Sequence, residues 1–513
     1  MPQAHKHSFL ITLGLIFLLP IFFIPGGALS LLSAKSALLT LGVIVALLTF
    51  IYEVWQSKTL RLPKHHFLVV VMLLPVLYAL SAVLSTPSSL SLFGYSFEVG
   101  TFGSMLLGAL LLILISTIFS DTSRILTALS AVFVSFSIIA LFAGIKVVFG
   151  PSTLLGVNNM GNPLGNWTDL SMACGLLALF SALTLGMIPL KLSARILLYV
   201  VFALSTILLA VVHFGTALIF TLIASILLAL YFAKVEKQFL NIGHIGPMKP
   251  IVLPIILAVV CLIFLVNPVV TKGGTKLGDI VADTFNITNT DVRPSFSATL
   301  GISKAVLSQA GLFGSGPNTF GHDWLIYKPA TVNGTPFWGV AFPFGAGFVP
   351  TQIASTGILG TALWLAFFAL LIALIFKAIS HMPESRASRF VLVSSLFLSV
   401  FLWAASFLYA PSLTMLMLAF AFSGLLVASL CESGLLPVRH IDLAESVQTR
   451  FVSLFLFGVV VVGALGLGWI GGEKTVSAYY FKKAVDLSNA SGTPLVDIEN
   501  QLIKAIQFAP ADI

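Results

Sequence analysis

Long runs of apolar residues, separated by short polar turns, cover most of the chain. An apolar helix of about 20 residues can cross the roughly 30 Å hydrocarbon layer of a membrane. Runs of this kind predict spans near residues 8–28, 36–55, 66–85, 99–119, 125–149, 168–188, 193–211, 214–233, 250–270, 349–377, 388–408, 411–430 and 451–471. We therefore predict an all-α integral membrane protein with about thirteen transmembrane helices. The division at His213 depends on a single short polar interruption.

The basic residues predict the orientation of these spans. Lysine and arginine concentrate in loops on the cytoplasmic side of membrane proteins. They gather here in alternate turns, at Lys58, Arg61, Lys64, Arg124, Lys191, Arg195, Lys234, Lys237, Lys249, Lys377, Arg386, Arg389, Arg439 and Arg450. Lys35 is the clear exception. The N-terminus is thus expected in the cytoplasm, as in a multi-pass protein of a bacterial inner membrane, and the loop 271–348 and the tail 472–513 outside it.

Composition supports this class and excludes others. The 513 residues are 58% hydrophobic and only 9% charged, whereas soluble domains carry about 25% charged residues. The net charge of +8 comes from scattered single residues, so no basic groove for nucleic acid is predicted. The three cysteines form no C-x-x-C motif, and we expect neither a metal site nor a cofactor.

The tail 472–513 differs from the rest of the chain. It is polar, with helical spacing of its apolar residues, and Ala505, Phe508 and Pro510 resemble the end of a tetratricopeptide repeat. A plain amphipathic helix pair explains the pattern equally well. One repeat cannot bury its own apolar face, so the tail is expected to pack on a protein partner or on the membrane domain.

Candidate chemistry is concentrated in the outer loop, residues 271–348, between the spans of 1–270 and 349–471. Arg293 stands before Pro294 at the start of a predicted helix over 299–310. Its guanidinium could bind a diphosphate through two parallel hydrogen bonds. Lys304 and Lys328 add positive charge for the same purpose. The alternative is an ordinary interfacial arginine that snorkels toward water or pairs with Asp291.

A glycine-rich turn follows in the same loop. Gly314, Gly316 and Pro317 permit a tight turn whose backbone N–H groups could hold an anion, although such a run can also be a plain turn. His322 comes next and is a candidate general base, although a surface histidine is the more common case.

Two further candidates lie outside this loop. Asp169 stands at the outer mouth of the sixth span, where an ionisable residue suggests function, but it could equally cap the helix N-terminus. His213 lies in the outer turn between the seventh and eighth spans. It is either a polar interruption or a second candidate base.

These features together resemble the O-antigen ligase and polymerase family of polytopic glycosyltransferases. The resemblance rests on the single large outer loop, on Arg293-x-x-Phe296 followed by Leu312–Phe320, and on Ser355-Thr356-Gly357-Ile358-Leu359-Gly360 after the loop. The family implies transfer of a polyprenyl-diphosphate-linked glycan, with Arg293 on the diphosphate. The chain departs from the family where a His-Asn pair is expected, at Ala346-Gly347, and where a Ser-Arg-Gly turn is expected, at His213-Phe214-Gly215.

The resemblance therefore implies a glycosyltransferase that acts at the outer face of the cytoplasmic membrane. Its donor would be a polyprenyl-diphosphate-linked glycan, and its acceptor a lipid A core, another glycan or a protein. Arg293, Lys304 and Lys328 would bind the diphosphate, and His322, His213 or Asp169 would serve as the base. Two alternatives are a transporter or flippase of lipid-linked glycan, which would need polar residues within its spans, and a non-catalytic assembly protein.

Overall fold

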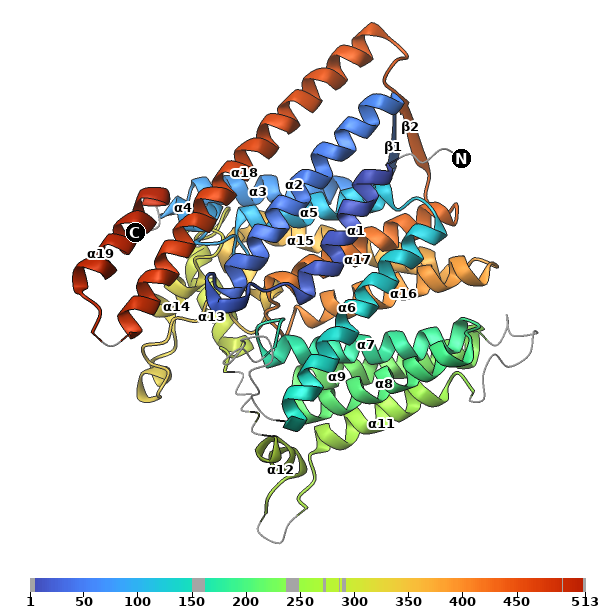
Figure 1. Cartoon of the computed structure of the whole chain (residues 1–513), viewed down its shortest axis with the longest axis horizontal. Coiled ribbons are helices and arrows are strands. Elements are labelled where there is room, and N and C mark those ends of the chain that lie inside the picture. Colours follow the sequence, from blue (N-terminus) through green and yellow to red (C-terminus); the bar gives the residue numbers. More distant parts are fainter. Residues whose placement is uncertain are drawn as a thin grey trace.

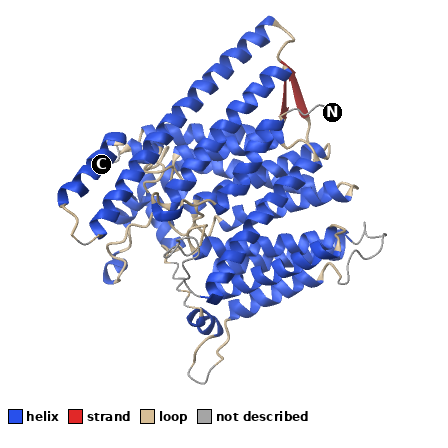
Figure 2. Cartoon of the chain, viewed as in Figure 1, coloured by secondary structure: helices blue, strands red, loops and turns tan. Residues whose placement is uncertain are grey.

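A computed structural model describes residues 5–149, 162–236, 249–270, 274–285, 287, 292–490 and 492–510, and most of them are helical (Figure 2). Within them, ten helices are long and apolar enough to cross a membrane. They are α2 (Leu31–Ser57), α3 (His66–Val83), α6 (Thr122–Phe149), α7 (Trp167–Met187), α8 (Leu192–Val212), α9 (Gly215–Leu230, extended to Lys234), α15 (Phe348–Ser380), α16 (Arg386–Ala405), α17 (Leu413–Glu432) and α18 (Val447–Asn489).

Three shorter apolar helices coincide with the remaining predicted spans: α1 (Lys6–Ile21), α5 (Phe102–Ile118) and α11 (Val252–Val266). The helical, multi-pass character of the protein is thus confirmed, and the count of about thirteen spans stays a prediction. The weakest boundary is also confirmed, because α8 ends at Val212 and α9 begins at Gly215.

The smaller elements lie at the two ends of the helical bundle. The N-terminus and the strands β1 (Thr59–Pro63) and β2 (Val438–Asp442) share one end, and α13 and α14 lie at the other (Figure 1). The remaining elements are η1 (Pro25–Gly27), α4 (Ser88–Leu92), η3 (Tyr231–Glu236), α12 (Leu277–Thr284), α13 (Phe296–Gln309), α14 (Phe320–Tyr327), η4 (Ala330–Gly334) and α19 (Leu495–Phe508).

Helix α17 forms the centre of the bundle. Its most apolar 18-residue window is 100% buried. Aromatic rings pack around it: Trp403 of α16 lies with its ring centroid 5.2 Å from that of Phe420 and 4.9 Å from that of Phe367. Such edge-on ring contacts add to the apolar burial, so α15, α16 and α17 form a rigid support for their outer ends.

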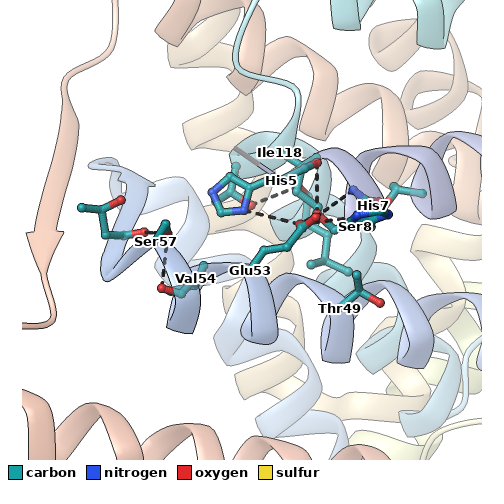
Figure 3. A network of polar contacts seen from close by, with 12 residues as sticks. His5, His7, Ser8, Thr49, Glu53, Val54, Ser57 and Ile118 are labelled. Atoms are coloured by element: carbon teal, nitrogen blue, oxygen red, sulfur yellow. Dashed lines mark hydrogen bonds and ion pairs between the residues drawn. The ribbon is translucent and has the colours of Figure 1, made fainter. Parts of the chain in front are cut away.

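A carboxylate fixes the N-terminus of α1 against α2. Glu53 accepts hydrogen bonds from the backbone N–H of His7 at 2.7 Å and from the Ser8 hydroxyl at 2.5 Å, and His5 Nδ1 lies 3.7 Å from it (Figure 3). A negative charge at a helix N-terminus satisfies N–H groups that have no partner within the helix. This contact holds the first helix in the bundle.

A two-stranded antiparallel sheet is an addition to the predicted all-α fold. Strand β1 pairs with β2, with Leu62 opposite Arg439 and Leu60 opposite Ile441. The alternation of polar and apolar residues in Thr59-Leu60-Arg61-Leu62 suits a strand. The two partners are far apart in the sequence, so local pattern alone did not predict the pairing.

The outer loop is inserted into a break in α15. Gly357 has non-helical backbone angles (φ 66°, ψ −161°), which leaves backbone groups of the helix without their usual partners. The outer loop supplies them. Ser315 N and Gly316 N donate to the carbonyls of Ala354 and Ser355, at 3.1 and 3.0 Å, and Ile358 N donates to the Gly311 carbonyl at 3.0 Å. A broken helix within a membrane is tolerated where other protein groups satisfy its backbone in this way.

The predicted boundary at residue 471 has no counterpart in the backbone. Helix α18 runs without interruption from the last predicted span into the tail. Helix α19 then folds back against it: Ser477 donates a hydrogen bond to the Ala505 carbonyl at 2.9 Å, and the rings of Tyr480 and Phe508 stack with centroids 6.0 Å apart. The tail is therefore a helical hairpin, an arrangement that a plain amphipathic helix pair and a single repeat share.

The orientation of the chain is a testable prediction. We expect a reporter inserted at Asn333, in η4, to be active outside the cytoplasm, because the basic turns fall on the opposite side of the bundle. A reporter pair that works only inside or only outside the cell would measure this. An insertion at Ser385, in the turn before α16, is the matched control and should report the cytoplasm. A cytoplasmic signal at Asn333 would contradict the orientation.

Candidate functional site

Arg293 connects three segments at the outer ends of the spans. Its Nη1 donates to the backbone carbonyl of Ala346 at 3.2 Å and to that of Leu408, and its Nη2 donates to the hydroxyl of Thr216 at 3.3 Å. The guanidinium also lies over the Phe214 ring, 5.6 Å from its centroid, a cation–π contact. The side chain is half-buried. Its contacts place the positive charge at the junction of α9, the α16–α17 turn and the end of the outer loop.

The local sequence explains where Arg293 stands. Ser295 caps α13, since its hydroxyl accepts the backbone N–H of Ala298 at 3.1 Å, and so the helix begins directly after Pro294. The buried Thr299 then accepts the backbone N–H of Ala346 at 2.9 Å. The first turn of α13 and the end of the outer loop are thereby fixed on both sides of the guanidinium.

Ala346 and Gly347 occupy the positions where the resembling family has its His-Asn pair. A Cβ at Gly347 would lie 2.4 Å from the backbone carbonyl oxygen of Phe407. The backbone N–H of Phe348 donates to the Tyr409 carbonyl at 3.1 Å. The α16–α17 turn therefore fills the space that a side chain at 347 would need, and Arg293 contacts backbone at 346 rather than an imidazole.

An apolar groove runs along the membrane-spanning part below Arg293. It measures about 400 Å³ and lies between α9 and α16, with the inner part of α15 on its third side. Thr216, which accepts from Arg293, stands one helical turn before Phe220, the outermost α9 residue of the groove. At the far end the groove reaches Lys234. The site thus combines a fixed cation with an adjoining slot for a hydrocarbon chain.

His213 is close to this cluster through its neighbour Phe214. It ends α8 in a left-handed conformation (φ 51°), and its Nε2 lies 2.8 Å from the carbonyl oxygen of Phe264. A carbonyl only accepts, so this nitrogen carries the proton and Nδ1 holds the lone pair of the neutral ring. A Cβ at Gly278 would lie 2.6 Å from Nδ1, which places the start of α12 against the ring.

Asp169 is fully buried and is not the helix cap. Asn166 performs that role, because its side-chain oxygen accepts the backbone N–H of Asp169 at 2.7 Å. Asp169 Oδ1 instead accepts from the backbone N–H of Ser412, at 3.4 Å, in the turn that also supplies the Leu408 carbonyl to Arg293. Asp169 and Arg293 therefore contact opposite ends of one turn, 406–412.

Lys35, the exception to the predicted charge distribution, is buried close to Asp169. It is 3% exposed, and its Nζ donates to the Pro20 carbonyl at 2.9 Å and to the Thr414 hydroxyl at 3.2 Å. Because it lies within the bundle rather than in a loop, it carries no information on orientation. Asp169 lies near enough for the two groups to interact electrostatically, which offsets only part of the cost of burying them.

The glycine-rich turn is not an anion cradle, which corrects the expectation for Gly314, Gly316 and Pro317. The backbone N–H of Gly314 donates to the Ala310 carbonyl at 2.9 Å, and those of Ser315 and Gly316 donate to α15. Because these donors are engaged, the turn has a structural role. It supplies hydrogen-bond partners for the backbone groups of α15 beside the break at Gly357.

The other predicted residues lie apart from Arg293. His322 is exposed on α14, and no contact joins it to Arg293 among the described residues. Lys304 lies on the exposed side of α13, and Lys328 donates to the backbone carbonyl of Trp338. Arg293 and Asp169 thus both contact the turn 406–412, and His213 adjoins Phe214, whose ring packs on Tyr409 of that turn. His322 and Lys304 are exposed and Lys328 is half-buried, away from these contacts.

Tyr409 is a site residue that the sequence did not indicate. It is 3% exposed, its ring packs 6.0 Å from that of Phe214, and its hydroxyl has no hydrogen-bond partner among the described residues. A buried hydroxyl without a partner is uncommon. The only sequence signal was its place in the short polar turn between two predicted spans.

Asp323 gives a pH-dependent prediction. Burial raises the pKa of its carboxyl group, against the hydrogen bond that it accepts from Ser315 at 2.6 Å and the charge of His322. The folded state then binds more protons than the unfolded state, so stability falls as the pH rises from the usual pKa of 3.8 through the folded value. We expect Asp323→Asn, which keeps an acceptor for Ser315, to remove this fall.

Apparent melting temperatures of the purified protein from about pH 4 to about pH 7 measure this effect. The difference between Asp323→Asn and the wild type should grow with pH in favour of the variant. Asp497→Asn, in the exposed first turn of α19, is the control and should follow the wild type. A constant difference for Asp323→Asn would contradict the argument.

Comparison with known proteins identifies no family. No protein-family model matches the sequence, and no curated protein is significantly similar to it. The functional argument therefore rests on the residues and their geometry.

Proposed function

We propose that the protein binds a polyprenyl-diphosphate-linked glycan and transfers the glycan to an acceptor hydroxyl at the outer membrane face. The observation that carries the proposal is that Thr216, which accepts a hydrogen bond from Arg293, stands one helical turn before Phe220 at the end of an apolar groove between α9 and α16. A guanidinium matches the two oxygens of a phosphate group. A long isoprenoid chain matches a groove of Phe, Leu, Ile and Val side chains that opens within the membrane.

The reaction would be a displacement at the anomeric carbon. The acceptor oxygen forms the new bond to that carbon, the bond to the diphosphate oxygen breaks, and the lipid diphosphate leaves with the electron pair. Arg293 would stabilise the negative charge that develops on the leaving group. The hydroxyl proton must pass to a base.

His213 is the candidate base nearest to the Arg293 contacts. It adjoins Phe214, over which Arg293 lies, and its Nδ1 holds a lone pair against the start of α12. We expect His213→Ala to lower transfer about a hundredfold while lipid-diphosphate binding is retained. His322→Ala, for which the sequence predicts the same effect, is the direct comparison. The measurement is transfer by the purified protein in proteoliposomes with a lipid-linked glycan, beside binding of the lipid diphosphate.

The results separate the roles clearly. Loss of transfer in His213→Ala alone supports His213 as base, and loss in His322→Ala alone supports His322. Near-full activity in the double variant excludes a histidine base and leaves Asp169 or a purely positional mechanism.

One observation favours a second function, a non-catalytic binder of the same lipid in an envelope assembly. Gly347 has no space for a side chain beside Phe407, so the family's polar pair could not be restored there without moving the turn. In that case the wild type would bind lipid diphosphate but transfer no glycan from any lipid-linked donor. A protein that does neither would overturn both functions.

A further inference from the structure

The two-stranded sheet lies at the end of the molecule where α1 begins (Figure 1). A second groove lies beneath this sheet. It measures about 820 Å³. The sheet forms its roof through Leu62, Arg439 and Ile441, which share one face because Leu62 is paired with Arg439 and side chains alternate along a strand. The first turns of α3 form its floor.

The rim of this groove is basic. Lys64 and Arg439 line it with exposed side chains, and no carboxylate among the described residues forms an ion pair with either. His65 and His66 complete the rim. Within the described parts of the chain, the two cations thus have no counter-ion.

His65 adds a donor to this rim. Its Nδ1 accepts the backbone N–H of Phe67 at 3.2 Å as the cap of α3, so in the neutral ring the other nitrogen carries the proton. Burial, the neighbouring His66 and the charge of Lys377 lower the pKa of His65, in that order. The ring is therefore neutral near pH 7, with Nε2–H available to an acceptor.

The floor of the groove is apolar and continues into the membrane-spanning part. Leu68, Val69 and Met72 line it. On the same side of α3, Val76 and Leu80 follow at helical spacing and are exposed by 54% and 51%. A hydrocarbon chain that begins under the sheet can therefore extend along α3 without meeting a polar group.

We propose that this groove binds an anionic phospholipid, with its phosphate headgroup between Lys64, Arg439 and His65 and an acyl chain along α3. Basic pockets beside transmembrane helices at the cytoplasmic level suit such headgroups. A soluble phosphate compound would use the rim but not the floor, so the apolar floor favours a lipid. The site is separate from Arg293, which lies at the opposite end of the bundle, and does not depend on the proposed transfer activity.

The test is native mass spectrometry of the delipidated full-length protein titrated with phosphatidylglycerol, with phosphatidylcholine as the neutral comparison. We expect the Lys64→Gln/Arg439→Gln variant to bind phosphatidylglycerol at least about tenfold more weakly. Arg386→Gln/Arg450→Gln removes the same charge at the starts of α16 and α18, outside the groove, and should bind like the wild type.

Three results would overturn the proposal. The two double variants could lose affinity equally, which would indicate non-specific attraction to a basic surface. Phosphatidylcholine could bind as tightly as phosphatidylglycerol. Soluble glycerol 3-phosphate could compete as effectively as the lipid, which would assign the rim to a soluble ligand. A melting temperature for each variant, measured without lipid, shows whether the fold is retained.

Discussion

Replacing Arg293 with alanine is expected to abolish glycan transfer while the protein still reaches the membrane in normal amounts. The guanidinium is held by two backbone carbonyls and the Thr216 hydroxyl beside the apolar groove. Removing one partner of a charge-assisted contact in such a site costs about 2–5 kcal/mol. Transfer should therefore fall by about thirtyfold to several thousandfold.

Arg293→Lys should restore only part of this activity. A lysine places a single point charge and cannot present the planar pair of N–H groups that suits a phosphate. Lys304→Ala is the matched control: it removes a cation from α13 at an exposed position away from the Arg293 contacts. Transfer rates in proteoliposomes and a melting temperature for each variant measure the effect.

Full activity in a folded Arg293→Ala protein would contradict the assignment of Arg293 to the diphosphate. A loss of equal size in Lys304→Ala would show instead that the general positive charge of the outer surface matters. Binding of lipid diphosphate without transfer in the wild type would leave the contact intact and favour the non-catalytic function.

The spans could be predicted because a helix in a membrane must be apolar along its whole length. In an unbroken span the backbone groups are satisfied within the helix itself, so local composition indicates where most spans lie. Even the boundary at His213 was visible, since one histidine and one glycine interrupt the apolar run. The helix after Pro294 was predicted for a similar local reason, a proline at its start.

The contacts that complete the fold could not be predicted, because they join residues far apart in the sequence. The break at Gly357 is stable only since residues 311–316 supply its backbone partners. The pairing of β1 with β2 joins the segment after α2 to the segment before α18. Lys35 had the appearance of a loop charge, and only the packing of Pro20 and Thr414 around it shows that it is buried.

The candidate site could be predicted only in part, because its contacts also join residues far apart in the sequence. Arg293 and His213 stood out as polar residues in an apolar chain, and the structure places both beside Phe214. The turn 406–412 gave no chemical signal, because it contributes backbone carbonyls and one buried tyrosine. His322 follows the glycine-rich turn in sequence. The backbone N–H groups of that turn bond to α15, however, and the histidine lies on the surface.

Gly314→Ala is expected to cause the largest loss of stability among single substitutions in the outer loop. Gly314 has a positive φ of 72°, and a Cβ there would lie 2.2 Å from the Ala354 carbonyl oxygen and 2.6 Å from the Gly357 nitrogen. Both neighbours are backbone atoms of the broken helix and cannot turn away as a side chain could. The loop must therefore move off α15.

That movement exposes the backbone groups that the loop now satisfies. The carbonyls of Ala354 and Ser355 and the N–H of Ile358 would lose their partners, and each buried group left unsatisfied costs about 1–3 kcal/mol. Together with the strained φ, we expect a loss of at least about 3 kcal/mol. Arg293 should lose its position as well, because α13 packs on the same part of α15.

Gly301→Ala is the matched control, since it adds the same methyl group nearby. Gly301 lies within α13, and a Cβ there would meet no atom within 4 Å. Alanine favours a helix by about 0.5–1 kcal/mol over glycine. The melting temperature of Gly301→Ala should equal or exceed that of the wild type, whereas Gly314→Ala should melt far lower or aggregate on extraction. If Gly314→Ala melts at the same temperature as the wild type, the loop does not stabilise the broken helix. The glycine-rich turn then becomes a candidate for binding the substrate again.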